Sequence, residues 1–237
     1  MKQSHNIALI LAGGTGERMH ASVPKQFMEI DGESVLLHTM LAFQHHPLIH
    51  EIYIVCTPEW EDFVRGEAKS GGIDKLSSII GAGKSSYASA CNGIRYLAET
   101  IKEPDAIVLV HDAVRPLITG DIISRNIAVC LTHGNAITAL PSYEAYLVTA
   151  DGSTSDKVVP REGMMRAQTP HTFPIATLRE MLREAEGQGI EESQSIFTLA
   201  GELGIAPLHI ARGDLRNFKI TEQSDILIYR ALKTLEE

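Results

Sequence analysis

The chain alternates short, continuous apolar runs with longer segments in which apolar residues return at every third or fourth position. Continuous apolar runs predict strands that are buried on both faces, whereas the longer spacing predicts helices with one buried face. The predicted strands are Ile7–Ala12, Glu51–Cys56, Leu76–Ile80, Ala106–Val110, Ala136–Leu140 and Leu208–Ala211. The predicted helices run from Val35 to about His45, from Glu59 to about Lys69, from Ser86 to Ile101 and from Asp121 to His133.

Strands and helices that alternate in this way predict an α/β fold with a mostly parallel central sheet that helices cover on each face. Residues 142–168 interrupt the pattern, because two short β-like pieces, Tyr146–Thr149 and Lys157–Val159, flank a turn at 151–153. We predict a protruding β-hairpin arm there, which would be a lid or a dimer contact. The chain as a whole is interpreted as a single domain, 1–237.

Composition narrows the function classes. The 237 residues are 44% hydrophobic, so a substantial core is expected, and the net charge is −9. An acidic chain is a poor candidate for a general nucleic-acid binder or for binding an anionic membrane surface. We expect a cytoplasmic protein, because the first residues lead straight into a strand and no apolar run approaches the length of a membrane span. The three cysteines, Cys56, Cys91 and Cys130, fall in predicted strands or helices and are expected to be buried free thiols.

A glycine-rich turn follows the first predicted strand. Gly13, Gly14 and Gly16 would let backbone N–H groups approach a phosphate without an intervening Cβ atom. Arg18 and Lys25 place two cations beside this turn, as a polyphosphate site requires. Taken alone, the glycines would equally suit a tight turn with no ligand.

Two familiar glycine motifs do not fit. A dinucleotide fingerprint needs a third glycine at the position of Met19, and a Walker A loop ending at Gly83-Lys84-Ser85 needs a glycine at Ser78. Ser85 or Ser86 is expected to cap the following helix instead.

A second cluster, His111 to Pro116, follows a fully apolar strand. Asp112 can hold Mg²⁺ against phosphate oxygens, and Arg115 can pair with a phosphate. The alternative is a structural aspartate at a helix start with an ordinary arginine. His111 is expected to be a packed histidine rather than a catalytic base. Both this cluster and the glycine turn end predicted parallel strands, where α/β sheets bind ligands, so one shared site is predicted.

A third cluster lies near the end of the chain. Asn217 and Lys219 are expected on one side of an extended segment, because side chains alternate there. Thr221 is predicted to cap the last helix, and Lys219 is either a phosphate contact or a solvated lysine.

Together these motifs resemble one enzyme family. The motifs are Leu11-Ala12-Gly13-Gly14-x-Gly16-x-Arg18-Met19, Pro24-Lys25-Gln26, His111-Asp112-Ala113-Val114-Arg115-Pro116, Gln168-Thr169-Pro170 and Asn217-Phe218-Lys219-Ile220-Thr221. Their order and spacing resemble the cytidylyltransferases that act on 2-C-methyl-D-erythritol 4-phosphate or ribitol 5-phosphate. The resemblance implies a Rossmann-like nucleotidyltransferase fold, CTP, Mg²⁺ or another divalent cation, and a homodimer built through the arm.

The resemblance also implies a reaction and residue roles. A polyol phosphate oxygen would attack the α-phosphorus of CTP in line, and pyrophosphate would leave. The implied catalytic residues are Arg18, Lys25 and Lys219. The implied nucleotide contacts are Ala12, Gly13, Gly14, Gly16, Gly83, Ser89 and Asp112, with Asp112 also contacting the metal. Arg115, Arg161 and Thr169 are implied near the polyol phosphate.

Departures from the family pattern fall on the polyol side. The family's second loop corresponds here to the segment that contains Gly83 and Ser89. Ser86 stands where this second loop usually has an arginine, and Lys84 would replace that cation. Tyr143-Glu144-Ala145 replaces the arm's usual Arg-Asp-Thr, so Arg161 or Arg166 would compensate. The acceptor therefore stays open between the two polyol phosphates, with a third polyol or sugar phosphate as a further alternative. The pathway (isoprenoid or cell-surface polymer) stays open with it. Two alternatives remain: a nucleotidyltransferase of the same fold with another nucleotide and a sugar phosphate, and a non-catalytic nucleotide-binding protein.

Overall fold

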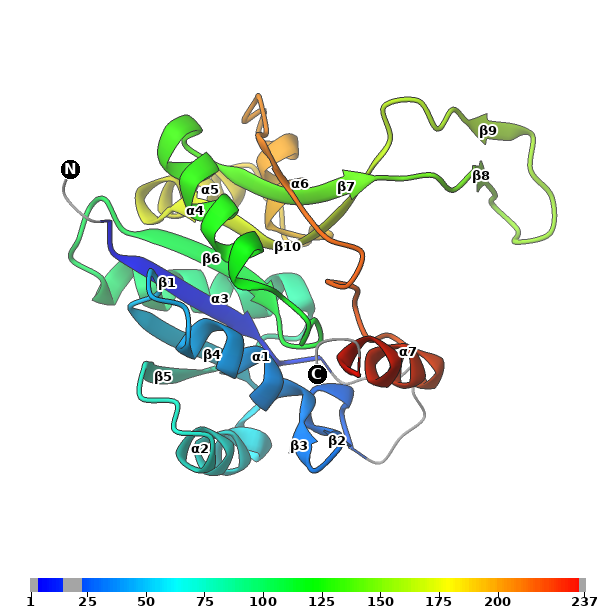
Figure 1. The fold of residues 1–237 in the computed structure, drawn as a ribbon. Coiled ribbons are helices and arrows are strands. Elements are labelled where there is room, and N and C mark those ends of the chain that lie inside the picture. Colours follow the sequence, from blue (N-terminus) through cyan, green and yellow to red (C-terminus); the bar gives the residue numbers. More distant parts are fainter. Residues whose placement is uncertain (1–3, 15–22, 235–237) are drawn as a thin grey trace.

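The central feature of the fold is a seven-stranded sheet in the order β11-β7-β10-β6-β1-β4-β5 (Figure 1). The computed structural model describes residues 4–14 and 23–234. The strands of this sheet are β1 (Asn6–Leu11), β4 (Glu51–Cys56), β5 (Leu76–Gly81), β6 (Ile107–Asp112), β7 (Ala136–Pro141), β10 (Met165–Pro174) and β11 (Ile210–Arg212). The α/β class and each strand predicted from an apolar run are confirmed, with ends shifted by one or two residues.

One strand of the sheet was not predicted. β10 runs antiparallel to both β6 and β7, whereas β1 is parallel to β4 and β6, and β7 is parallel to β11. β10 also shortens the predicted arm, because Met165–Ala167 already pair with β7. Its pairing with β7 shifts register between Ala167 and His171. Pro170 lies inside this irregularity, where a residue without an N–H donor is tolerated.

Helices cover both faces of the sheet (Figure 1), as predicted. On one face the apolar residues of α1 (Val35–Gln44), α2 (Glu61–Ser70) and α4 (Gly120–His133) join one buried core cluster. On the other, α3 (Ser86–Thr100), α5 (Ile175–Gly187) and α6 (Ile196–Glu202) form a second cluster. Neighbouring strand residues alternate between the two clusters, as the pleat requires; Ala8 and Ile10 face the first, Ile7 and Leu9 the second.

Serine side chains cap the starts of α1 and α3, and the cap at Ser85 is one of the two positions predicted. The Ser34 hydroxyl accepts a hydrogen bond from Leu37 N–H at 3.1 Å, and Ser85 does the same for Ala88 N–H at 3.0 Å. The prediction that Thr221 caps the last helix was wrong by one position. Glu222 is the N-cap of α7 (Gln223–Lys233), because it shares a capping box with the carboxylate of Asp225.

The remaining elements lie at the margins of the sheet. The short helices η2 (Lys25–Phe27) and η3 (Pro58–Trp60) and the small hairpin of β2 (Glu29–Ile30) and β3 (Glu33–Ser34) flank the carboxyl ends of β1 and β4. α7 packs near this hairpin through a third buried cluster that includes Ile30 and Tyr229. In the part of the chain that the structure describes, no helix combines the length and apolar character needed to cross a bilayer.

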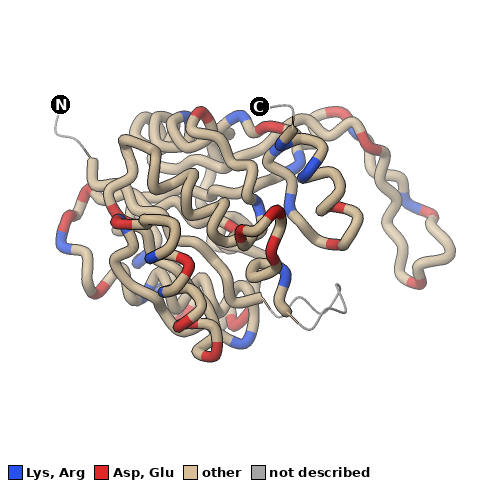
Figure 2. The backbone as a smooth tube through the Cα atoms, turned by 60° about the horizontal axis from the view of Figure 1, so that its bottom comes forward, with Lys and Arg blue, Asp and Glu red and all other residues tan. Residues whose placement is uncertain are grey.

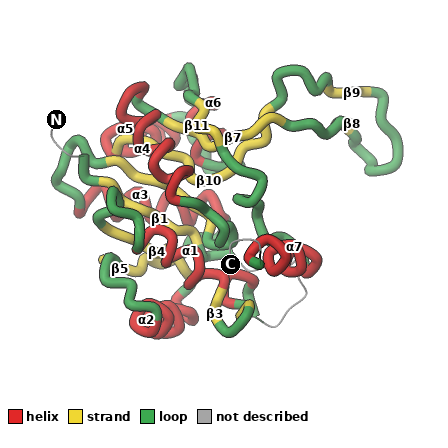
Figure 3. Tube along the Cα trace, in the orientation of Figure 1, coloured by secondary structure: helices red, strands yellow, loops and turns green. Residues whose placement is uncertain are grey.

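The predicted arm protrudes from the body of the molecule (Figure 1). Its strands β8 (Tyr146–Val148) and β9 (Lys157–Val159) pair only with each other, and most of the arm is loop (Figure 3). Leu147 and Val158 face each other in register and are 65% and 69% exposed. In the view of Figure 2 the Lys, Arg, Asp and Glu positions are interspersed over the surface rather than gathered into one continuous face.

Candidate active site

The candidate site lies where the carboxyl ends of β1 and β6 meet β10. Asp112 is the last residue of β6 and pairs in register with Leu11, the last residue of β1. The glycine turn follows β1 directly. β10 approaches the same edge from the opposite direction, so Thr169 reaches the end of β6. Sequence positions that are far apart therefore converge on one edge of the sheet, as the arrangement of parallel strand ends predicted.

Asp112 is held between two cations. Its Oδ2 atom lies 3.1 Å from Lys219 Nζ and 3.2 Å from Arg115 Nε. Arg115 also donates from Nη1 to the backbone carbonyl of Asn217 at 2.8 Å. Asn217 is fully buried, and its side-chain amide donates to Thr169 O at 2.8 Å. The second and third sequence clusters thus form one charged group.

The charges of this group determine the protonation state of the Asp112 carboxylate. Burial alone would raise the pKa of Asp112, but Lys219 and Arg115 outweigh burial and hold that pKa well below its usual range. Burial lowers the pKa of Arg115, while the neighbouring Asp112 opposes that change. Asp112 is therefore an ionised carboxylate at neutral pH, the form that a divalent cation binds.

His111 is a packed histidine, as expected. It is fully buried, and burial lowers its pKa to about 3, so it is neutral. The Thr169 hydroxyl accepts a hydrogen bond from Asp112 N–H at 3.0 Å and lies 3.1 Å from His111 Nδ1. His111 Nε2 lies 3.3 Å from the carbonyl of Arg115. We assign the ring proton to Nε2, because Nδ1 then accepts from Thr169 while Nε2 donates to Arg115. This network fixes the backbone on both sides of Asp112.

The glycine turn is pressed against the second loop. An ideal Cβ atom on Gly13 would lie 2.6 Å from Ala82 Cβ and 3.0 Å from Ser89 Oγ, and one on Gly83 would lie 2.5 Å from Ala88 Cβ. Glycine is required at both positions because any side chain would collide. The Ser89 hydroxyl faces Gly13 and also accepts a hydrogen bond from Gly83 N–H at 3.0 Å. The structure thus brings together three predicted nucleotide contacts.

The other residues of the glycine turn are placed differently. Ala12 extends the sheet, because its N–H donates to Val55 O at 2.7 Å. Gly14 is exposed, and a Cβ there would meet open space. The predicted residues Gly16 and Arg18 lie outside the described residues. The roles proposed for all of these positions remain predictions.

Lys25 lies in η2 and is largely buried. Against the effect of burial, hydrogen bonds from the Thr221 and Glu222 N–H groups, together with the charge of Lys25, lower the pKa of Asp225. Asp225 and Lys219 line the same cavity of about 550 Å³.

Two adjoining cavities share Arg115 and Lys219 of that charged group. The first, of about 240 Å³, is lined by Asp112, Lys219 and Thr169, by Ser86 at the start of α3, and by the segment 194–197. The second is the 550 Å³ cavity, which Arg166 and Arg216 also line. Among the predicted compensating arginines, the structure brings Arg166 to this region. Arg161 is exposed on the arm and lines neither cavity, and Lys84 is exposed on the second loop.

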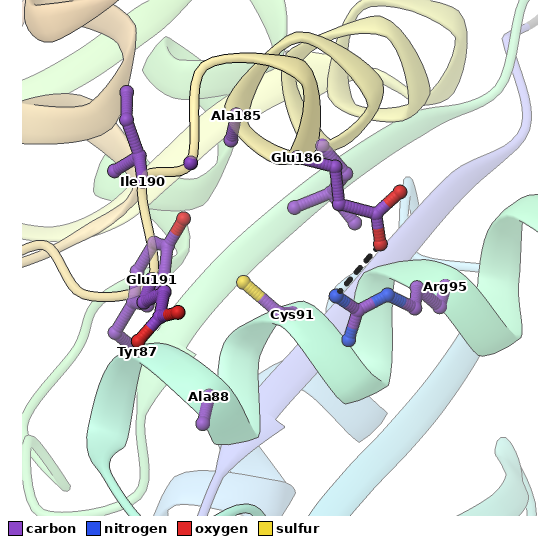
Figure 4. A pocket seen from close by; sticks show the side chains of 10 residues that line it. Tyr87, Ala88, Cys91, Arg95, Ala185, Glu186, Ile190 and Glu191 are labelled. Carbon is purple, nitrogen blue, oxygen red and sulfur yellow. Dashed lines mark ion pairs between the residues drawn. The ribbon is translucent and has the colours of Figure 1, made fainter.

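A further cavity, of about 390 Å³, lies between α3 and α5 (Figure 4). Tyr87 lines both this cavity and the 240 Å³ cavity. Arg95 and Glu186 pair across it at 3.5 Å, and burial raises the pKa of Cys91, so its thiol stays protonated. The sequence cysteines are all buried and free, as expected.

Sequence reasoning assigned no role to two residues that shape the site, Gln168 and Glu192. Gln168 joins β10 to the loop between β11 and α7, because its amide donates a hydrogen bond to Asp214 O at 2.9 Å. Glu192 ties the segment before α6 to the second loop, since its carboxylate accepts from the Ser85 hydroxyl at 2.9 Å. No sequence signal placed Glu192 beside Ser85.

Comparisons with known proteins agree with this geometry. Residues 6–234 match the family model described as 2-C-methyl-D-erythritol 4-phosphate cytidylyltransferase. A ribitol-5-phosphate cytidylyltransferase of Lacticaseibacillus paracasei is 32% identical over 226 residues, which is 94% of this chain and 96% of the relative. A 2-C-methyl-D-erythritol 4-phosphate cytidylyltransferase of Syntrophus aciditrophicus is 34% identical over 236 residues, which is 98% of this chain and 97% of the relative.

Solved structures have the same fold. The 2-C-methyl-D-erythritol 4-phosphate cytidylyltransferase of Thermus thermophilus superposes with a TM-score of 0.73 at 27% identity, covering 98% of each chain. The 4-diphosphocytidyl-2C-methyl-D-erythritol synthase of Anaerococcus prevotii superposes with a TM-score of 0.81, covering 98% of this chain and 97% of that one. Its identity of 22% supports the fold alone.

Proposed function

We propose, because this chain belongs to the 2-C-methyl-D-erythritol 4-phosphate cytidylyltransferase family, that it transfers a cytidylyl group from CTP to a polyol phosphate and releases pyrophosphate. The observation that carries the proposal is the placement of Asp112, Arg115 and Lys219 beside the glycine turn. Cations at this position suit a reaction in which negative charge is shared among attacking, transferred and leaving phosphates.

The residues would have different roles in this reaction, according to their positions in the site. The glycine turn would hold the triphosphate through backbone N–H groups, while Lys25 would neutralise the phosphates beside it. Lys219 and Arg115 would orient the acceptor phosphate, so that its oxygen attacks the α-phosphorus opposite the leaving pyrophosphate. Little covalent chemistry is left to the protein, and catalysis would come from alignment and charge.

Asp112 fits a magnesium ion that arrives with the nucleotide. Within residues 4–14 and 23–234 there is no group of three or more His, Cys, Asp or Glu side chains that could hold a metal by themselves. A single ionised carboxylate is nevertheless sufficient for Mg²⁺, which commonly takes one or two carboxylates together with substrate phosphates and water. When bound, the metal would neutralise phosphate charge.

The acceptor is the next question for experiment. Relatives named for ribitol 5-phosphate and for 2-C-methyl-D-erythritol 4-phosphate are 32% and 34% identical to this chain. Pyrophosphate release should therefore be measured with CTP and each polyol phosphate in turn. Turnover with either acceptor supports the proposal, and the kcat/KM ratio identifies the acceptor.

The same assay tests the alternatives. Replacing CTP by UTP, GTP or ATP should abolish most of the turnover, and a clear preference for another nucleotide would contradict the proposal. CTP binding without pyrophosphate release across both acceptors would favour a non-catalytic nucleotide-binding protein.

We also propose that two copies associate through the arm. A two-stranded hairpin is marginal by itself in water, and Leu147 and Val158 expose apolar surface on both of its strands. Light scattering should give the mass of a dimer for the natural chain and that of a monomer for Val158→Asp. Leu131→Asp is a matched control, because Leu131 is 59% exposed on α4, outside the arm. An unchanged dimer in Val158→Asp would contradict this use of the arm.

A further inference from the structure

Gln26 is buried beneath the glycine turn, with a side chain that is 2% exposed. Its Nε2 group donates to Ala12 O and to Gly14 O, each at 2.7 Å. Both hydrogens of the amide are thus used on carbonyls of the same turn. The identity of the amide nitrogen is fixed by chemistry, because two carbonyl oxygens can accept a hydrogen bond but cannot donate one.

These two bonds orient the turn. The peptide group that joins Ala12 to Gly13 is planar and trans, so its C=O and N–H point in opposite directions. Because Gln26 draws the Ala12 carbonyl toward itself, the N–H of Gly13 is directed away from Gln26. A short, flexible glycine segment would otherwise sample many orientations of that N–H.

The residues on either side of Gln26 connect it to the body of the protein and to Lys25. Phe27 is buried and stacks on Trp60 with ring centroids 4.4 Å apart, and it meets Phe63 edge-on at 5.5 Å. η2 therefore has a rigid aromatic base. Lys25 occupies the first position of the same short helix. The bonds from Gln26 fix the glycine turn relative to the element that carries Lys25.

We propose that Gln26 is a positioning residue that presets the glycine turn and its spacing from Lys25 for binding of a triphosphate. This inference rests on the proposed function, since it assigns the turn and Lys25 to the same nucleotide. Gln26 does not itself contact the reacting atoms. It acts by removing alternative turn conformations before the nucleotide binds, which lowers the ordering cost of binding.

Gln26→Met tests the proposal, because methionine is close to glutamine in length and has no donor for the two carbonyls. We expect the KM for CTP to rise about tenfold or more and kcat/KM to fall roughly 100-fold, as a displacement of about 1 Å at a reacting group can produce. The KM for the polyol phosphate should stay within about twofold of the natural chain, because its cations lie on other elements. A general loss of structure would change both constants.

Asn126→Leu is the matched control. Asn126 is fully buried, and its amide likewise donates twice, to Ile122 O at 2.9 Å and to Thr138 Oγ1 at 2.8 Å. Thermal melting should show a loss of stability in both variants, but the KM for CTP should rise only in Gln26→Met. Gln26→Asn retains the amide with a shorter reach and should give an intermediate KM.

Three results would overturn the proposal. One is a Gln26→Met enzyme whose CTP constants remain within about threefold of the natural values. Another is an equal rise in the KM for CTP in Asn126→Leu. The last is failure of both Gln26 variants to fold, which would make the residue a structural one.

Binding of inorganic tripolyphosphate, measured by calorimetry, separates this proposal from the proposed function. If the natural chain does not turn over CTP, the proposed function fails. Tighter tripolyphosphate binding by the natural chain than by Gln26→Met would still support the role of Gln26. Equal affinities would contradict it.

Discussion

Replacing Lys219 by methionine distinguishes the contribution of its charge to the reaction rate from its contribution to the stability of the fold. Lys219 Nζ lies 3.1 Å from Asp112 Oδ2, and its side chain is 38% exposed. Methionine retains much of the length of the apolar stem and removes the ammonium group. Arg115 remains 3.2 Å from the same carboxylate oxygen, so Asp112 keeps a cationic partner in the variant.

The two expected magnitudes differ widely. Removing one preorganised charge from a site of charge transfer costs about 2.7–4 kcal/mol in the barrier, or about 10²–10³ in rate. The free energy of unfolding should change by at most about 1 kcal/mol, because solvent screens an ion pair whose lysine is more than one-third exposed. A large kinetic loss with little loss of stability is therefore the expected signature.

Pyrophosphate release under steady-state conditions gives the kinetic change, and urea denaturation gives the stability change. Arg230→Met is the control, because Arg230 pairs with Asp31 at the same distance of 3.1 Å on the surface. It should leave both measurements nearly unchanged. A folded Lys219→Met enzyme with kcat/KM within about threefold of the natural value would refute the role of Lys219.

Further predictions concern the metal, pH and a helix cap. Chelation of divalent cations should abolish turnover, and added Mg²⁺ should restore it. Asp112→Asn should raise the Mg²⁺ concentration that gives half-maximal activity. An unchanged Mg²⁺ titration in this variant would exclude Asp112 as a ligand. Burial lowers the pKa of His171 from 6.5 to about 4, so the unfolded chain takes up the proton first as pH falls. The part of the stability that depends on neutral His171 is fully present above pH 6.5 and should decline by about 3 kcal/mol toward pH 4. His171→Gln should remove that part of the pH slope in denaturant titrations, whereas buried His111, whose pKa is also lowered, keeps its own part. Ser85→Ala removes the bonds to Ala88 N–H and Glu192 and should lower the free energy of unfolding by about 1 kcal/mol, whereas an unchanged urea midpoint would contradict the capping role.

The parts of the fold with a strong local pattern could be predicted from sequence. β1, β4 and β6 are apolar at nearly every position, and their burial on both faces follows from this pattern. β10 could not be predicted in the same way, because its sequence Met165–Pro174 is largely polar and contains prolines. It becomes a central strand only because β6 and β7 offer it pairing edges on both sides.

α5 has a clear helical periodicity in its sequence, although no helix was predicted there. Its buried residues, Ile175, Leu178, Met181, Leu182 and Ala185, recur at helical spacing directly after Pro174. α6 is short, and its buried face is completed only by packing against α5 and the sheet. Local periodicity was sufficient for the first of these helices and insufficient for the second.

In the candidate site, too, some residues could be identified from the sequence and others could not. Asp112 and Arg115 were identified from residue type and from their position after a predicted strand, and Lys219 from its place in an extended segment. The structure brings the three side chains together. The partners that orient them, Thr169 and Asn217 among them, act through single hydrogen bonds across about 50 to 100 residues of sequence. Such contacts leave no periodic trace in the chain.

The sequence by itself determined which segments are buried, where glycine is needed and which charges stand at strand ends, because each of these follows from the properties of neighbouring residues. Only the tertiary structure decided that β10 runs antiparallel, that Arg166 rather than Arg161 lines the cavity beside Lys219, and that Gln26 bonds the carbonyls of Ala12 and Gly14. Those outcomes depend on distances between distant segments, and such distances are fixed when the sheet assembles.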